Sequence, residues 1–275
     1  MRNPPRKIGF VLAASEHGTM IVNRFDYRMF DADHGLGVGF EILKNGSYAL
    51  SEVDTALWAL SLRRQYFGDG VVALDCGANI GVHTIEWAKH VNGWGQVIAI
   101  EAQERVFYAL AGNIVINNCF NARAIHAAVA AHAGTMRIPT PDYLSPGSFG
   151  SLELRHSDCN EPIGQPVDYS DTAMVGIRTI TIDSLGLARL DLLKIDVEGM
   201  EVEALAGAAD SLARCRPVLI VESLKSDHAK LRETLEKQGY QLFAAGINWF
   251  AVHGEDKTLE HFLAGIGPAA GAVKL

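Results

Sequence analysis

The 275-residue sequence has few cysteines, no long apolar run and no excess of positive charge. The cysteines form no C-x-x-C pair, which disfavours a disulfide framework or a zinc site and favours reduced thiols in the cytoplasm. No apolar run approaches the roughly 20 residues of a membrane-spanning helix. The 24 basic residues are outnumbered by 32 acidic ones, giving a net charge of -8, so a positive surface field for nucleic-acid phosphates is not expected. We therefore expect a cytoplasmic protein with no nucleic-acid or membrane partner.

The chain instead has an alternating pattern of apolar strands and amphipathic helices. The first helix is expected from Ser51, as N-cap, to just before Gly68. Strands at 71–74, 96–100 and 122–126 then alternate with helices at 81–90 and 105–118. After a break, the pattern continues with a strand in 190–199, a helix to about 213, a strand in 216–223, and a helix capped by Ser226 and ended by Gly239. This order predicts an α/β fold with a mostly parallel sheet covered by helices on both faces. Two strands joined by a turn at 245–247 are expected to close the sheet in antiparallel orientation.

Three segments lie outside this alternation. Residues 1–50 combine short apolar stretches with glycine-rich turns, which predicts a β-rich extension of strands or hairpins rather than helices, beginning with a buried strand in "RKIGFVLAAS". Residues 139–176 are rich in proline, glycine, serine and aspartate, and a loop of this length between two strands is typical of a functional lid. We therefore divide the chain into an extension (1–50), a main domain (51–256) containing the lid, and a tail (257–275).

The turn "DCGANIG" follows the first strand of the main domain, where open parallel sheets bind ligands. A dinucleotide fingerprint needs glycines at i, i+2 and i+5, but Gly77 is followed by Asn79 and Val82. Asp75 at the strand end, with Gly77, Asn79 and Gly81 after it, is instead typical of S-adenosylmethionine-binding folds. Asparagine replaces glycine here because its short side chain supports a left-handed backbone. Such a turn lets backbone N–H groups approach a ligand, and the following helix N-terminus can receive a carboxylate.

A second marker is Glu101, at the end of the next strand and 26 residues after Asp75. A carboxylate in this position can accept hydrogen bonds from both hydroxyls of a ribose. Because nicotinamide-dependent enzymes share this feature, Glu101 indicates a nucleoside rather than a methyl donor in particular.

A third marker is the acid-rich block "LLKIDVEGMEVEAL". Lys194 and Asp196 share one face of a strand, and Glu198 follows at its carboxyl edge. We expect Asp196 and Glu198 to project toward the ligand, where acids stabilise a sulfonium and one can take a proton from an attacking hydroxyl. Glu222 ends the neighbouring strand and joins them as a weaker catalytic candidate.

Other polar and aromatic residues have a structural interpretation. Glu201 and Glu203 fall in the first turn of a helix, where the helix dipole favours acids. Cys76 is interpreted as a small buried residue rather than a nucleophile, and Trp87 as core or cleft wall. His83 can either contact the ligand carboxylate or pack against the sheet, and both interpretations stay open. The remaining histidines lack metal-ligand spacing, so no metal site is predicted.

Together the motifs "LDCGANIGVHT", "AIEA", "NIVIN", "TIDSL", "LLKIDVEGMEVEAL" and "PVLIVE" resemble the FkbM family of S-adenosylmethionine-dependent methyltransferases, over about residues 46–253. The resemblance implies the class I methyltransferase Rossmann-like fold, with seven strands of which the last is antiparallel. It also implies O-methylation of a hydroxyl on a sugar or polyketide-like natural product. The lid matches the family mainly at "GSFGSL", which leaves the acceptor open.

The sequence thus predicts an S-adenosylmethionine-dependent O-methyltransferase with a small-molecule acceptor. Candidate cofactor-binding residues are Asp75, Cys76, Gly77, Asn79, Gly81, His83, Thr84, Glu101, Ala102 and Asp196, and candidate catalytic residues are Asp196, Glu198 and Glu222. The alternatives are a non-catalytic nucleoside-binding module, a nicotinamide-dependent oxidoreductase and, against the net charge, a nucleic-acid methyltransferase. A homodimer is left open.

Overall fold

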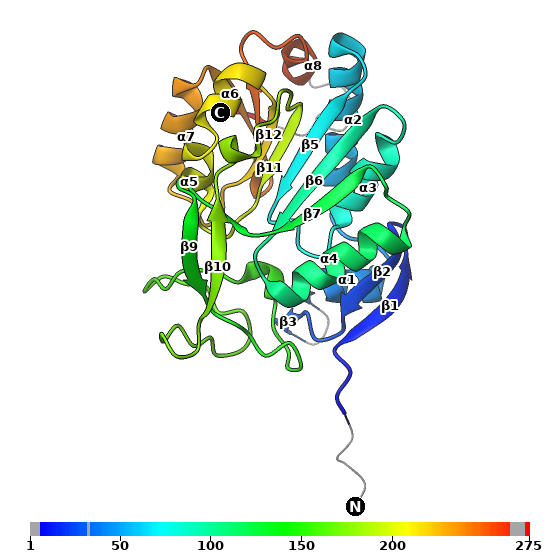
Figure 1. Ribbon diagram of the computed structural model, residues 1–275, viewed down its shortest axis with the longest axis vertical. Helices are drawn as coiled ribbons and strands as arrows, with labels where there is room; N and C mark the ends of the chain where they lie inside the picture. Colours follow the sequence, from blue (N-terminus) through cyan, green and yellow to red (C-terminus); the bar gives the residue numbers. More distant parts are fainter. Residues whose placement is uncertain (1–5, 32–33, 265–272) are drawn as a thin grey trace, which may run out of the picture. The chain divides into compact units, whose positions relative to one another are not determined.

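The computed structural model describes residues 6–31, 34–264 and 273–275 (Figure 1). The chain forms two compact units, one from residues up to 48 with 137–176 and one from 49–136 with 177–275. It passes between them within β9 (Gly134–Ile138) and β10 (Val175–Ile180), which form a three-stranded sheet with β8 (Ala128–Val129) in the order β8-β10-β9. The predicted extension and the predicted lid therefore contribute to the same unit. The predicted boundaries at 50 and 256 stay predictions.

The larger unit contains a sheet in the order β15-β13-β14-β12-β11-β5-β6-β7. Its strands are β5 (Val71–Cys76), β6 (Gly95–Glu101), β7 (Ala122–His126), β11 (Leu192–Ile195), β12 (Val218–Glu222), β13 (Tyr240–Ala245), β14 (Asn248–His253) and β15 (Val273–Lys274). The five strands from β7 to β12 pair in parallel, and β14 is antiparallel to β12. The predicted seven-stranded sheet with an antiparallel last strand is confirmed, and β15 adds a short edge strand.

Helices cover both faces of this sheet, as predicted. The helices are α2 (Leu50–Phe67), α3 (Val82–His90), α4 (Glu104–Ile116), α5 (Glu201–Ala206), α6 (Ala209–Cys215), α7 (His228–Lys237) and α8 (Leu259–Leu263), with the 3-10 turn η2 (Asp183–Leu185). Figure 1 shows α2 and α3 on one side of the central strands and α5, α6 and α7 on the other. α5 to α7 cover a continuous apolar face that includes Leu74, Ile98, Leu193 and Leu219, all at most 1% exposed. None of the helices among the described residues has the length and apolar character that a bilayer crossing needs.

The strand ends opposite the predicted site are joined by a buried ionic network. Asp191 is fully buried just before β11 and accepts the backbone N–H of Val72, the second residue of β5, at 2.9 Å. The Nε atoms of Arg63 and Arg189 lie 3.1 and 2.8 Å from its two carboxylate oxygens. The guanidinium of Arg63 also pairs with Asp256. This network joins the starts of β5 and β11, and Arg63 connects α2 to them.

Several helix boundaries differ from the sequence prediction. Ala49 precedes α2 in place of Ser51, and Asp227, rather than Ser226, caps α7 by accepting two backbone N–H groups. The predicted single helix after β11 is divided into α5 and α6 around Gly207. A Cβ atom on Gly207 would lie 2.3 Å from the carbonyl oxygen of Ala130, so glycine lets the chain lie against Ala130 at this break, a tertiary contact that the local sequence does not reveal.

The predicted tail contributes α8 and β15 to the larger unit. The segment 265–272 between them lies outside the described residues.

The smaller unit contains β1 (Phe10–Ser15), β2 (Gly18–Asn23), β3 (Arg28–Met29), β4 (Gly35–Leu36), α1 (Val38–Asn45) and the 3-10 turn η1 (Phe149–Ser151). The predicted hairpins are present as β1–β2 and β3–β4. The first strand is half-exposed rather than buried, so that part of the prediction is wrong.

The exclusion of helices from residues 1–50 is also wrong, because α1 follows the glycine-rich stretch. Asp26 Oδ2 accepts the N–H of Gly39 in the first turn of α1 at 2.9 Å, and Asp26 Oδ1 accepts the N–H of Phe149 at 2.9 Å. A Cβ atom on Gly39 would lie 2.2 Å from the carbonyl oxygen of Asn23. The glycine that suggests a turn in the sequence instead allows β2 to approach the helix closely.

Candidate functional site

Polar side chains occupy the carboxyl ends of the neighbouring strands in the larger unit. Glu101 ends β6, Asp75 lies near the end of β5, Lys194 is opposite Asp75 on β11, Glu222 ends β12 and Asn248 begins β14. The order of the strands reverses between β5 and β11, because the chain continues outward from β5 to β7 on one side and from β11 to β12 on the other. Ligands of open α/β sheets bind outside such a reversal, so these residues mark the candidate site.

The turn after β5 has the left-handed backbone that the sequence predicts. Gly77 has φ 78° and Asn79 has φ 50°. A Cβ atom on Gly77 would lie 1.7 Å from the carbonyl oxygen of Asp196, so only glycine allows the end of β11 to lie against this turn. Asn79 stabilises its own conformation, because its Oδ1 accepts the N–H of Ile80 at 2.7 Å.

Glu101 is buried and held by two backbone groups. Its Oε2 accepts the N–H of Asn79 at 2.9 Å, and its Oε1 accepts the N–H of Gln103 at 2.7 Å. Burial raises the pKa of Glu101 to about 7, although these hydrogen bonds act in the opposite direction. The backbone N–H of Ala102 also acts on this carboxylate, and because a carboxylate has about four acceptor positions, room is left for a hydroxyl donor. Ala102 follows on the same edge, and its carbonyl oxygen lies 3.0 Å from His126 Nε2.

Asp75 and Thr84 connect β5 to the start of α3. The Thr84 hydroxyl donates to Asp75 Oδ2 at 2.6 Å, while Asp75 Oδ1 is buried without a hydrogen-bond partner. Gly81, with φ 93°, precedes α3 as its N-cap. Cys76 is fully buried, and burial raises the pKa of its thiol well above the usual value, which agrees with a packing role rather than a nucleophilic one.

His83 is part of a buried polar contact that the sequence analysis missed. Its Nε2 lies 3.0 Å from Oε1 of Glu52, which comes from the first turn of α2, and its ring packs edge-on against Trp87. Asn248 donates to the other oxygen of Glu52 at 2.7 Å. Burial acts to raise the pKa of Glu52, but the nearby His83, the charge of Lys194 and the hydrogen bond from Asn248 together outweigh it and lower the pKa to about 2. In the sequence, Glu52 is one of two acids suited to a helix start, and nothing local distinguishes it.

The three predicted catalytic acids lie together. One carboxylate oxygen from each of Asp196, Glu198 and Glu222 lies within 4.8 Å of the others. Glu198 has φ 56°, a strained conformation for glutamate that turns the chain sharply after β11. Burial raises the pKa of Glu198 well above its usual value and that of Glu222 to about 8, and the negative charge of Asp196 adds to both shifts.

Two lysines neutralise part of this acid group. Lys194 Nζ lies 2.6 Å from Oδ2 of Asp196, as expected for residues on one face of the strand. Lys225 Nζ lies 2.5 Å from Oε2 of Glu198. Lys225 was missed in the sequence, because it comes from the loop after β12 and no motif marks it. Glu222 Oε2 is buried without a hydrogen-bond partner.

Glu201 holds the loop that carries Asp196 and Glu198. Its Oε1 accepts the N–H groups of Val197 and Gly199, each at 3.1 Å, and its Oε2 accepts the hydroxyl of Ser226 at 2.6 Å. The interpretation of Glu201 as a helix-capping acid is therefore incomplete, because this fully buried side chain fixes the turn itself. Glu203 lies half-buried in α5.

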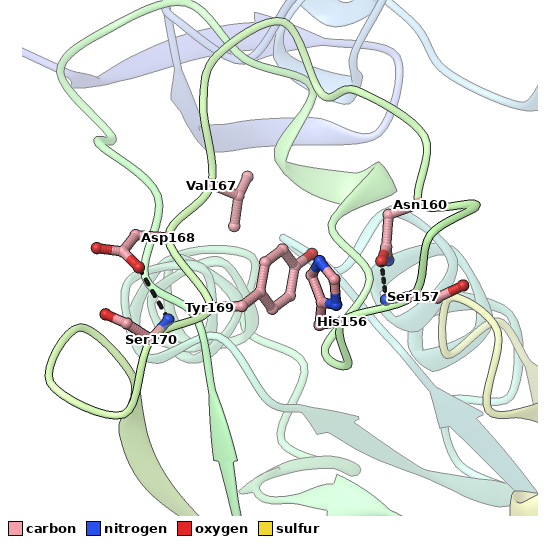
Figure 2. A pocket seen from close by; sticks show the side chains of 7 residues that line it. All are labelled: His156, Ser157, Asn160, Val167, Asp168, Tyr169 and Ser170. Atoms are coloured by element: carbon pink, nitrogen blue, oxygen red, sulfur yellow. Dashed lines mark hydrogen bonds between the residues drawn. The ribbon is translucent and has the colours of Figure 1, made fainter.

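The smaller unit has a separate hollow of about 580 Å³, lined by His156, Ser157, Asn160, Val167, Asp168, Tyr169 and Ser170 (Figure 2). The rings of His156 and Tyr169 pack edge-on with centroids 5.3 Å apart. Asp168 accepts the N–H of Ser170 at 2.8 Å, which closes a local turn. None of the sequence-predicted site residues lines this hollow. All of those residues lie in the larger unit.

The fold and the strand-end residues define an α/β protein of the doubly wound class with an acid-lined site at the reversal of its strand order. The sequence profile of the family described as the Methyltransferase FkbM domain matches residues 75–242, more than half of the chain. The chain therefore belongs to the FkbM methyltransferase family.

Two relatives named as methyltransferases are similar to the chain in sequence. "Methyltransferase 1" of Beauveria bassiana (strain ARSEF 2860) is 24% identical over 194 residues, covering 66% of this chain and 77% of its own length. "Methyltransferase sdnD" of Sordaria araneosa is 22% identical over 201 residues, covering 64% of this chain and 76% of its own length.

Similar solved structures are also methyltransferases. Methyltransferase FkbM from Methylobacillus flagellatus KT is 16% identical, with a TM-score of 0.47 over 68% of this chain; the match spans 46%, about half, of that structure. Magnesium protoporphyrin IX methyltransferase from Synechocystis PCC 6803, solved with bound S-adenosylmethionine, is 12% identical, with a TM-score of 0.42 over 78% of this chain and 88% of its own.

Proposed function

We propose that this protein is an S-adenosylmethionine-dependent O-methyltransferase that modifies a hydroxyl group of a sugar or natural-product-like small molecule. The observation that carries the proposal is Glu101, a buried carboxylate fixed by the N–H groups of Asn79 and Gln103, beside a turn that only Gly77 allows. In a chain of the FkbM family, this arrangement suits the ribose of the cofactor.

The residues around the turn fit the proposed cofactor. Glu101 keeps acceptor capacity for the ribose, and Ala102 lies beside it. The backbone from Cys76 to Asn79 presents little side-chain bulk toward the proposed ligand, and the N-terminus of α3 after Gly81 favours a carboxylate. His83 is paired with Glu52, which fixes the orientation of its ring. In this orientation His83 would contact the carboxylate of the proposed cofactor. Thr84 acts through Asp75, which it orients.

The bound cofactor would supply an electrophilic methyl group on a positively charged sulfur. The chain's own contribution is then to hold the acceptor oxygen about 3 Å from that methyl group and to manage its proton. Asp196 or Glu198 would orient or deprotonate the hydroxyl. Asp196, paired with Lys194, also places negative charge near the sulfonium. Glu222 is the third member of the acid group and a weaker candidate for the base.

The first test separates the methyl-donor site from a nicotinamide site. S-adenosylhomocysteine is expected to raise the melting temperature of the protein, and NAD is not, because a ligand stabilises the folded state only by binding it. A shift with NAD alone would indicate an oxidoreductase and contradict the proposal.

The second test concerns catalysis. Transfer of radiolabelled methyl groups from S-adenosylmethionine to a panel of hydroxylated sugars and polyketide-like compounds would identify an acceptor. Glu198→Gln is expected to retain S-adenosylhomocysteine binding, and at least one of Asp196→Asn and Glu198→Gln to lose about 10²-fold or more in turnover. Glu233→Gln, on the exposed face of α7, is the matched control. Wild-type turnover in both site variants would contradict the assignment of the base, and cofactor binding without any transfer would support a non-catalytic module.

A further inference from the structure

We propose that Asp196, Glu198 and Glu222 form a binding site for a hard divalent cation, with Mg²⁺ as its expected occupant. The sequence analysis assigns no metal site, because the histidines lack metal-ligand spacing, and the three acids lie on two separate segments of the chain. The fold brings them together at the ends of the adjacent strands β11 and β12.

The geometry suits oxygen coordination. One oxygen from each carboxylate lies within 4.8 Å of the other two. In a six-coordinate shell with ligands at about 2.1 Å, opposite oxygens are about 4.2 Å apart and adjacent ones about 3 Å, so small side-chain rotations would complete the site. All three donors are carboxylates, which favour Mg²⁺, Mn²⁺ or Ca²⁺ over metals that prefer nitrogen or sulfur ligands.

Glu222 provides an independent indication of a ligand. Its side chain is only 6% exposed, and its Oε2 is buried without a hydrogen-bond partner. A buried carboxylate oxygen without a partner is costly, and native proteins normally supply one. A cation held between Glu222, Asp196 and Glu198 would supply such a partner.

The two lysines leave room for this cation. Lys194 contacts Oδ2 of Asp196, and Lys225 contacts Oε2 of Glu198, so each ammonium group takes one oxygen of its partner. The formal charge of the three carboxylates and two ammonium groups is -1. A divalent cation would change this formal charge to +1, and each lysine contacts only one oxygen of its carboxylate partner in the two pairs described above.

The expected role of the cation depends on the proposed function. Three carboxylates occupy three positions of a six-coordinate ion, which leaves positions for oxygen atoms of water or of the acceptor. An acceptor hydroxyl bound there would lose its proton more easily and would be held at a fixed position beside Asp196. This favours acceptors with a second oxygen next to the reacting hydroxyl, because such molecules can chelate.

The test uses the full chain, freed of metal with a chelator and titrated with Mn²⁺, whose electron paramagnetic resonance signal reports the unbound ion. Wild-type protein is expected to bind one Mn²⁺ per chain, with displacement by Mg²⁺. Glu222→Gln and Glu198→Gln are each expected to weaken binding at least tenfold. Glu233→Gln removes the same charge from a surface site on α7 and is expected to bind like wild type.

Binding of Mn²⁺ that is equal in the Glu222→Gln and Glu233→Gln variants, or absent in the wild type at millimolar concentration, would overturn the proposal. Circular dichroism of each variant verifies folding, and a Glu222→Gln protein that does not fold leaves Glu198→Gln to decide. Parallel titration with S-adenosylhomocysteine in excess chelator separates the two proposals. If that ligand binds and Mn²⁺ does not, only the cation site fails; if it does not bind, the proposed function fails.

Discussion

Gly77 is the residue at which β5 and β11 meet the candidate site. Its left-handed backbone disfavours any side chain, and the carbonyl oxygen of Asp196 occupies the place of a Cβ atom at 1.7 Å. The two effects are separable, because Gly93 has a similar φ of 82° with nothing within 4 Å of a Cβ atom.

We predict that Gly77→Ala lowers the free energy of unfolding by about 3 kcal/mol or more, because it adds steric overlap to backbone strain. Gly93→Ala carries the strain alone and is expected to cost about 1 kcal/mol. Urea denaturation followed by circular dichroism measures both. Equal losses in the two variants would mean that β11 can move away from the turn without cost.

Glu101 has a pKa raised to about 7, so at the proposed cofactor site it would make binding sensitive to pH. Ribose hydroxyls donate to the ionised carboxylate, so the binding-competent fraction grows as the pH rises through 7. We predict that the affinity for S-adenosylhomocysteine increases about tenfold between pH 6 and pH 8, as the ionised fraction does. Calorimetric titration measures it.

Glu101→Gln removes the titrating group and is expected to bind more weakly, with little change over this pH range. If Glu101→Gln keeps the pH dependence of the wild type, a different group is responsible and the assignment of Glu101 to the ribose is weakened.

At the scale of elements, the larger unit is fixed at both ends of its central strands. Asp191 and Arg63 join β5, β11 and α2 at one end, and Glu52 and His83 join α2 to α3 at the other. α2 therefore contributes to both ends, although it precedes the first strand of the sheet in the sequence.

We predict that Asp191→Ala lowers the free energy of unfolding by about 3–5 kcal/mol, because it leaves the buried guanidinium of Arg63 short of a partner and the N–H of Val72 without one. Asp69→Ala, which breaks the exposed pair with Arg64, is the matched control and is expected to cost less than about 1 kcal/mol. Thermal and urea unfolding would distinguish them. A loss in Asp191→Ala no larger than in Asp69→Ala would contradict a stabilising role for the network.

At the scale of the whole molecule, the periodic segments were predictable and the tertiary contacts were not. The alternation of strands and helices predicts the sheet and its antiparallel closure, because strand burial and helix spacing are encoded locally. Helix α1 and the break at Gly207 were missed, since each depends on a glycine that accommodates another segment's backbone. Those glycines look like ordinary turn signals in the sequence.

The same distinction holds for the candidate site. Asp75, Glu101, Asp196 and Glu222 could be placed at one edge from the sequence because each lies at or next to the end of a recognisable strand, and parallel strands place their carboxyl ends at one edge. Glu52 and Lys225 were missed because they reach this edge from a helix and a loop. The position of Glu222 at the end of its strand predicts that it lies near Asp196 and Glu198. That its Oε2 has no hydrogen-bond partner can be seen only in the structure.

The contacts of Glu52 with His83 and Asn248 have a consequence for the design of truncated or chimeric versions of this protein. Glu52 and Asn248 both fall outside the stretch 75–242 that the family profile recognises. A fragment limited to that stretch would keep the motif histidine but lose its carboxylate and the amide that steadies it. A chimeric protein that contains this site should therefore take α2 and the β13–β14 hairpin from the same parent chain.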